Sequence, residues 1–172
     1  MKTALGLALA GVLLAGCQTM QQGPRAHAEL QPTKGNTARG EATFVQTADN
    51  QVRVTVTVDG LKPGSEHGFH IHEAGDCSAP DAMSAKGHFN PAGKPHGHPS
   101  MADHHAGDLP ALKADAGGRA TAEATLQGIS ISAGAASILG RGLIVHADPD
   151  DYKTQPTGNS GARIACGVIQ AG

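Results

Sequence analysis

Histidine is the residue type in this chain that is best suited to chemistry. Ten of the 172 residues are histidines, and eight of these lie between His67 and His105. His70 and His72 form a His-x-His pair, and side chains two residues apart on a β-strand point to the same face. Both imidazoles can therefore bind one metal ion, although such a pair on its own is a weak signal for a metal site.

More candidate metal ligands follow this pair along the chain. They are His88, His96, His105, Asp108 and His146. Zinc binds histidine and carboxylate side chains in tetrahedral geometry, and imidazole also suits copper. With the His-x-His pair these residues make seven candidate ligands, which is more than one ion requires. The sequence therefore predicts two metal ions.

Short strands joined by glycine-rich turns are predicted to position these residues. Apolar and polar residues alternate at 40–47 and most clearly at 51–58, and the turn residues between them predict a hairpin. Further short strands are predicted at 67–72, 118–126, 142–146 and 163–169. No window shows the apolar stripe of a helix, and 24 glycines and 10 prolines argue against a helix bundle. We expect one all-β domain, an antiparallel sandwich or barrel.

Two stretches of the chain lack this alternation. Residues 73–113 hold most of the histidines together with glycine, proline and aspartate, and residues 147–162 have a similar composition. Loops of this length count against a compact domain unless something organises them. Metal ions and a disulfide are the candidates for that role.

The composition argues against several kinds of partner. A formal net charge of −2 with no basic run argues against nucleic acid. The chain has three phenylalanines, one tyrosine and no tryptophan, so it has few residues for a surface that stacks on RNA bases or sugars.

The first residues are typical of an export signal. Lys2 precedes an apolar run at 4–15 that is too short to span a bilayer as a helix. The sequence LAGC at 14–17 resembles the bacterial lipoprotein signal. This implies a signal peptide at 1–16, a lipid on Cys17, a flexible tether at 17–27 and a domain at 28–172. Gln18 after the cysteine favours anchoring in the outer membrane, facing the periplasm; the alternative is an ordinary secretory signal with an incidental cysteine.

Cys77 and Cys166 are the cysteines that remain once Cys17 is set aside. An even pair in an exported protein predicts a disulfide, because the compartment outside the cytoplasm is oxidising. The bond would close a loop of about 90 residues and contribute about 4–5 kcal/mol in the chain-entropy model. The alternative is two buried free thiols.

Several of these motifs resemble those of the copper,zinc superoxide dismutase family in order and spacing. The matching segments are GFHIHE (68–73), GHFNP (87–91), HG (96–97), HAGDL (105–109), VH (145–146) and GNSGARIACGVI (158–169). The resemblance implies an eight-stranded antiparallel Greek-key barrel with long metal-binding and substrate-guiding loops. It also implies an oxidoreductase that converts superoxide to dioxygen and hydrogen peroxide by copper redox cycling and so protects the cell envelope.

The resemblance implies a role for each candidate residue, with one copper and one zinc ion per subunit. The implied copper ligands are His70, His72, His88 and His146, and the implied zinc ligands are His88, His96, His105 and Asp108. His88 would bridge the two metals and pass a proton to the product. Asp150 would link a copper-binding to a zinc-binding histidine, and Arg163 would attract the superoxide anion. Cys77 and Cys166 match the disulfide of the family.

The other histidines receive plainer interpretations. His67 is expected to pack near the copper-binding strands, and His98 and His104 are expected to be exposed or to pack within the loop. His104 beside His105 leaves the zinc ligand ambiguous by one position, and the nine-residue spacing from His96 favours His105. His27 falls in the predicted tether and has no assigned role.

Two other functions stay open from the sequence. One is a metal buffer without catalysis on the same fold, and the other is a zinc hydrolase, which the absence of an HExxH motif disfavours. The segment between His146 and Arg163 departs from the pattern of many eukaryotic relatives, so steering residues beyond Arg163 are not transferred. Dimer contacts differ among bacterial members, which leaves a monomer and a homodimer open.

Overall fold

The computed structural model describes residues 23–172. The predicted signal peptide, the predicted lipidation site Cys17 and the first part of the predicted tether lie outside the described residues. Within them the strands are β1 (Arg25–Pro32), β2 (Arg39–Ala48), β3 (Gln51–Asp59), β4 (Glu66–His67), β5 (Phe69–His72), β6 (Leu112–Lys113), β7 (Ala120–Gln127), β8 (Gly142–His146), β9 (Arg163–Val168) and β10 (Gln170–Ala171). One short 3-10 helix, η1 (Met83–Ala85), interrupts them. None of the helical segments among residues 23–172 has the length and hydropathy to cross a membrane.

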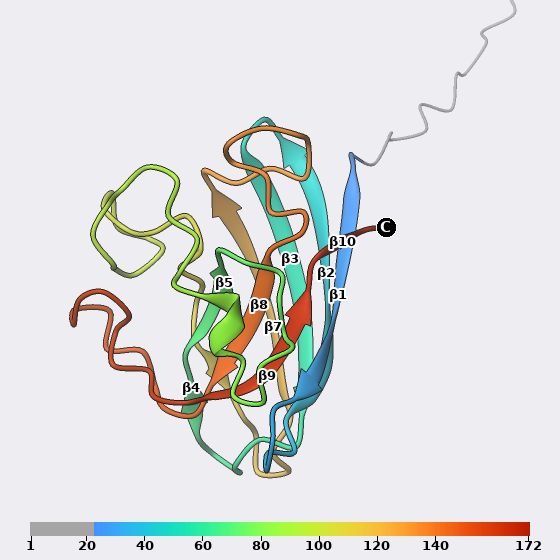
Figure 1. Cartoon of the computed structure of the whole chain (residues 1–172), viewed down its shortest axis with the longest axis vertical. Coiled ribbons are helices and arrows are strands. Elements are labelled where there is room, and N and C mark those ends of the chain that lie inside the picture. The colour runs from blue at the N-terminus through green and yellow to red at the C-terminus, as the bar shows by residue number, and fades with distance from the viewer. Residues whose placement is uncertain (1–22) are drawn as a thin grey trace, which may run out of the picture.

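Eight of the ten strands among the described residues form one curled antiparallel sheet. Its order is β5-β8-β9-β1-β2-β3-β7, with β10 also paired to β1 as the eighth strand, while β4 and β6 form a separate two-stranded sheet. The neighbour of β3 is β7, so the chain crosses over between them as in a Greek key (Figure 1). β1 joins the two halves of the sheet, because its residues 25–30 pair with β2 and its last two residues pair with β9. The predicted all-β fold is confirmed.

The first strand corrects the predicted domain boundary. β1 begins at Arg25, so residues 25–27 belong to the sheet and not to the tether predicted at 17–27. Exposed and buried residues alternate along β1, and Ala26, Ala28 and Leu30 point into the core. Alanine is only weakly apolar, which is why the alternation in the sequence did not reveal the strand. His27 lies in β1 and its side chain is exposed.

The core lies inside the curled sheet, as the alternating strands require. Val52, Val54, Val56 and Val58 of β3 are all at most 2% exposed and face the same cluster of apolar side chains. β8 differs, because all five of its residues are buried. Its Ile144 packs outside the main core, in a small cluster that also contains Ala82, Ala85 and Cys166. The long loop therefore covers the outer face of β8.

The two stretches that lacked alternation are the two long loops of the structure. Residues 73–111, up to the start of β6, form the first, and residues 147–162, between β8 and β9, form the second. In Figure 1 both project on the side of the barrel away from β1, where they lie together over β5 and β8. The predicted metal ligands lie between these loops and the strands.

Candidate metal centre

The seven predicted ligands come together in two overlapping groups. One group contains His70, His72, His88 and His146, and the other contains His88, His96, His105 and Asp108. In each group the candidate ligand atoms lie within 4.8 Å of one another, and every one of the residues is buried. His88 belongs to both groups, so the two sites share one imidazole.

Strands β5 and β8 supply three ligands of the first group. Phe69 and Ile71 of β5 point into the hydrophobic core, so His70 and His72 point to the opposite face, as the period of two predicts. His146 ends β8, which pairs with β5. His88 joins them from the loop, through an isolated β-bridge to His72. This outer face of β5 is buried only because the long loops cover it.

Hydrogen bonds leave one ring nitrogen of each histidine in the first group for a metal. The Nδ1 atoms of His72 and His146 donate to the carbonyls of Lys86 and Gly161, at 2.9 and 3.2 Å. Their Nε2 atoms face each other at 3.4 Å. His70 Nδ1 and His88 Nε2 are buried without any hydrogen-bond partner, which costs free energy unless something binds them. Four nitrogen donors of this kind fit one metal ion.

The second group offers three nitrogens and one carboxylate oxygen. His88 Nδ1 and His96 Nδ1 lie 2.9 and 3.0 Å from Asp108 Oδ1, and His105 Nδ1 lies 3.4 Å from the same oxygen. The other oxygen of Asp108 accepts hydrogen bonds from the backbone N–H groups of Gly97 and His105, at 3.1 and 2.8 Å. A four-coordinate zinc site uses imidazole and carboxylate donors of this kind. Both donor sets therefore fit the metals that the sequence predicts.

Asp150 connects the two groups. His70 Nε2 donates to Asp150 Oδ2 at 2.7 Å, and His96 Nε2 donates to Asp150 Oδ1 at 2.9 Å. Oδ1 also accepts the backbone N–H of Tyr152, at 2.7 Å. A carboxylate in this place fixes both the orientation and the tautomer of the rings, because each then presents Nδ1 to its metal.

Burial sets the protonation of the first group. It lowers the pKa of His70, and it lowers those of His72 and His146 well below their usual value. Burial also lowers the pKa of His88 to about 4, against the opposing hydrogen bond from Asp108. These imidazoles are therefore neutral at neutral pH, and the neutral ring is the form that binds a metal.

The charged side chains of the site are Asp108, Asp150 and His96. Burial raises the pKa of Asp108 and of Asp150, but the hydrogen bonds from histidines outweigh it and hold both pKa values well below the usual range. Burial likewise lowers the pKa of His96, and its bonds to the two carboxylates outweigh that effect and raise the pKa to about 9. Protons and zinc therefore compete most directly at His96.

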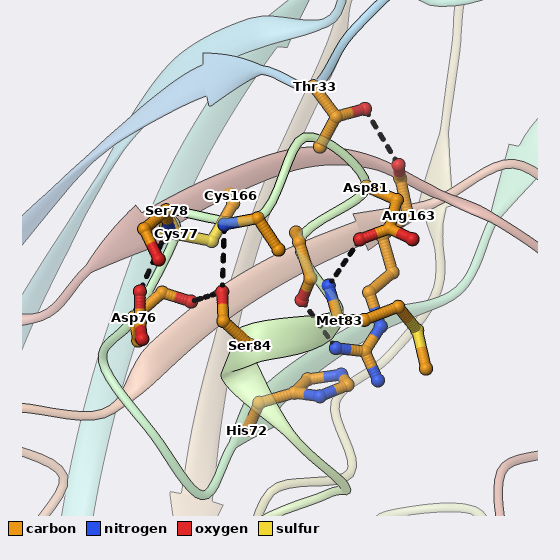
Figure 2. Close-up of a disulfide and its surroundings, with 12 residues drawn as sticks. Thr33, His72, Asp76, Cys77, Ser78, Asp81, Met83, Ser84, Arg163 and Cys166 are labelled. Carbon is orange, nitrogen blue, oxygen red and sulfur yellow. Dashed lines mark hydrogen bonds between the residues drawn. A yellow bond between two sulfur atoms is a disulfide. The ribbon is translucent and has the colours of Figure 1, made fainter.

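Arg163 borders a pocket that leads to the first group. The pocket has a volume of about 720 Å³, and its lining includes His72, His146 and Arg163. The guanidinium of Arg163 donates to the carbonyl of Ala82 at 2.6 Å and to that of Lys86. Figure 2 shows this guanidinium next to His72, which lines the same pocket. The fixed positive charge of Arg163 thus lies at an opening to two of the metal-binding rings.

The predicted disulfide is confirmed and supports this arrangement. Cys77 and Cys166 are bonded, with their Cα atoms 5.8 Å apart. Cys77 lies in the first long loop and Cys166 in β9, three residues after Arg163, as Figure 2 shows. The bond therefore ties the loop that holds the guanidinium to the strand that carries it.

The remaining histidines lie outside both groups. His67 is buried, with Nδ1 donating to the carbonyl of His146 at 2.8 Å and Nε2 lying 2.6 Å from Ser65 Oγ. His104 donates from Nδ1 to the carbonyl of His105, so the structure brings His105 and not His104 to the second group. His98 bonds Ser100 and packs edge-on against Tyr152.

Some residues that position the site were not found from the sequence. Gln155 bonds both backbone groups of His96, and the hydroxyl of Tyr152 accepts the backbone N–H of Ala111 at 2.8 Å. The carbonyl of Lys86 holds both His72 and Arg163. Bonds of this kind involve backbone groups that every residue carries, so they leave no signature in the residue types.

An antiparallel β-barrel with two buried metal sites that share one histidine defines a binuclear metalloprotein. The family model for copper/zinc superoxide dismutase matches residues 38–169. Superoxide dismutase (Cu-Zn) 2 of Aquifex aeolicus is 42% identical over 166 residues, covering 94% of this chain and 96% of the relative. Superoxide dismutase (Cu-Zn) 1 of the same organism is 39% identical over 150 residues, covering 85% and 88%.

A solved structure also matches this chain in both fold and sequence. The crystal structure of the clock protein EA4 has 41% sequence identity and a TM-score of 0.76, and the match covers 85% of this chain and 93% of that chain. The chain therefore belongs to the copper/zinc superoxide dismutase family. It is an oxidoreductase that dismutates superoxide, with copper and zinc as its cofactors.

Proposed function

We propose that the first group binds copper, that the second binds zinc, and that the shared His88 links them in catalysis. The observation that carries this assignment is the division of donors: four imidazole nitrogens in one group, and three imidazoles with one carboxylate in the other. When bound, copper supplies the exchange of single electrons with superoxide, which zinc, with no redox chemistry, does not.

His88 is the residue we assign to proton transfer. Its Nε2 faces the first group and has no hydrogen-bond partner in the protein, while its Nδ1 faces the second group. Nε2 takes a proton from solvent and delivers it to the reduced substrate, which takes a second proton from solvent and leaves as hydrogen peroxide. The Nδ1 side holds the ring in place, so the proton is donated and recovered at one atom.

Arg163 is assigned to attracting and orienting the superoxide anion. Its guanidinium is anchored to two backbone carbonyls and lines the same pocket as His72 and His146. Burial lowers its pKa, but an arginine in a protein stays charged. A fixed positive charge in a pocket raises the local concentration of a small anion.

The assignment is tested by the metal-loaded protein and its Arg163→Ala variant. We expect the wild type to remove superoxide, and we expect kcat/KM to fall by about tenfold in the variant, because the anion loses its local attraction. Arg119→Ala is the matched control, since Arg119 forms an exposed pair with Asp59 and does not line this pocket. Equal rates in wild type and Arg163→Ala would remove Arg163 from the mechanism.

We also propose that the chain is exported and anchored by a lipid on Cys17 at the periplasmic face of the outer membrane, where it protects the cell envelope. The LAGC sequence at 14–17 and the bonded cysteine pair, which needs an oxidising compartment, support this location. Mass spectrometry of the mature N-terminus is the test. We expect a lipid-modified Cys17 as the first residue, and an unmodified start elsewhere would contradict the anchor.

A further inference from the structure

Gln155 makes an unusual pair of hydrogen bonds with the backbone of a metal-site residue. Its Oε1 accepts the backbone N–H of His96 at 2.8 Å, and its Nε2 donates to the backbone carbonyl of His96 at 2.9 Å. The two residues lie 59 positions apart, in different long loops. One side chain therefore satisfies both backbone groups of His96.

His96 depends on this pair more than the other ligands depend on any side chain. His70, His72 and His146 are held by strands, and His88 and Asp108 by isolated β-bridges to β5. The carbonyl of His105 accepts the backbone N–H of Asp108 at 3.0 Å. The backbone of His96 makes no hydrogen bond to another backbone group among the described residues, so the Gln155 side chain takes the place of a strand.

The loop around Gln155 is built to present it. The carboxylate of Asp151 accepts the backbone N–H groups of Lys153 and Thr154, at 2.9 and 2.8 Å. The backbone N–H of Gly158 donates to the carbonyl of Thr154, and that of Asp151 to the carbonyl of Gly158, at 2.7 and 2.9 Å. These hydrogen bonds fold residues 151–158 into a closed loop, and Gln155 lies within this loop.

The same loop also approaches His96 at its ring. Asp150 accepts His96 Nε2, and Gly158 lies so close that a Cβ there would overlap Asp150 Oδ1 and come within 2.5 Å of His96 Nε2. The second long loop therefore holds His96 at three atoms. Asp150 holds the ring nitrogen Nε2, and Gln155 is the one residue of this loop that bonds the two backbone atoms.

We propose that Gln155 is a positioning residue for zinc: it holds the backbone of His96 so that Nδ1 stays aimed at the second site. The inference rests on the proposed assignment of His96 to zinc. Gln155 belongs to neither donor group and does not line the pocket beside Arg163. Its effect falls on the retention of zinc and not of copper, because His96 is absent from the first group. Removing partners that orient a metal ligand weakens metal binding by about 10–100-fold.

The test measures the release of zinc and copper from the fully metal-loaded chain into a chromogenic chelator. The variants are Gln155→Ala, which removes the side chain, and Gln155→Met, which keeps most of its bulk and loses both hydrogen bonds. Gln155 is exposed, so neither variant is expected to change the thermal unfolding midpoint of the metal-free protein by more than about 2 °C. We expect zinc release to be about tenfold faster in both variants, with copper release unchanged.

Gln170→Met is the matched control, because it makes the same exchange at an exposed glutamine in β10, outside both long loops. We expect it to release zinc at the wild-type rate. Wild-type release in both Gln155 variants, or equally fast release in Gln170→Met, would overturn the role of Gln155. A wild type that holds copper but no zinc in the second group would instead overturn the assignment of His96.

Discussion

The ring nitrogens of the clustered histidines are divided between protein and metal by their hydrogen bonds. His70 uses Nε2 for Asp150 and keeps Nδ1 free, whereas His72 uses Nδ1 for a carbonyl and keeps Nε2 free. Each of these two histidines thus has one nitrogen that sets its orientation and one that remains for chemistry. The hydrogen bonds of the protein set the tautomer of both rings before any metal binds.

The ligands and the linking Asp150 could be predicted at the scale of residues, and the other groups that support the ligands could not. Histidine and aspartate are types that bind metals, and their spacing matched a known pattern, so all seven clustered residues were found. Gln155 and the carbonyl of Lys86 were missed, because an amide side chain on an exposed loop and a backbone carbonyl are both common. Their importance follows only from what lies next to them in space.

Asp81 provides a prediction at this scale. It lines the same pocket as Arg163 and its negative charge acts on the guanidinium. Asp81→Asn removes the charge and keeps an oxygen to accept the backbone N–H of Met83, which Asp81 accepts at 3.0 Å. We expect kcat/KM for superoxide to rise by about twofold at low ionic strength, because a charge that repels the anion is gone.

The salt dependence checks the cause of this effect. The kcat/KM of Asp81→Asn should fall to that of the wild type as the ionic strength approaches about 0.5 M, because salt screens exposed charges. Asp49→Asn changes the same charge in the β2–β3 turn, outside the pocket, and should leave the rate unchanged. A salt-independent gain would mean that the substitution acts on the pocket's shape.

At the scale of elements, every strand of four or more residues except β1 was predicted, and the two-residue strands were not predicted as separate strands. β2 and β3 follow the pattern that was read at 40–47 and 51–58. β4 and β6 have two residues each, too few for any alternation to show. β1 buries alanines, so its inward face carries little hydropathy.

The long loops obtain their order from contacts that are far apart in the sequence. The first loop is held by metal-site residues, by the disulfide and by the small cluster over Ile144. The second is held by its own Asp151 and by Asp150 and Gln155 on His96. Local sequence therefore predicts irregular structure correctly and cannot show that this structure is well defined.

At the scale of the whole molecule, the disulfide closes residues 77–166 into one covalent loop, which contains most of the first long loop, all of the second and strands β6, β7 and β8. Cys77 and Cys166 are 89 residues apart. For the double variant Cys77→Ser/Cys166→Ser we expect the free energy of unfolding to fall by about 4 kcal/mol, because the unfolded chain regains its entropy. Unfolding of the metal-free protein in guanidinium chloride measures this difference.

The same variant has a second expected result. The first loop carries the two carbonyls that hold Arg163, so loosening it should also lower the activity of the metal-loaded protein. Chemical reduction of the wild type should reproduce both effects, since it breaks the same bond. A metal-free double variant as stable as the oxidised, metal-free wild type would show that packing alone orders this loop.

The early start of β1 sets how far the enzyme could move from a membrane if Cys17 carries the proposed lipid. With Arg25 already in the sheet, only eight peptide units separate it from Cys17, and a fully extended chain of that length spans at most about 28 Å. A lipid on Cys17 would therefore keep Arg25, at the start of the barrel, within about 28 Å of the bilayer surface. Superoxide would then be intercepted in a thin layer along the membrane and not throughout the surrounding fluid.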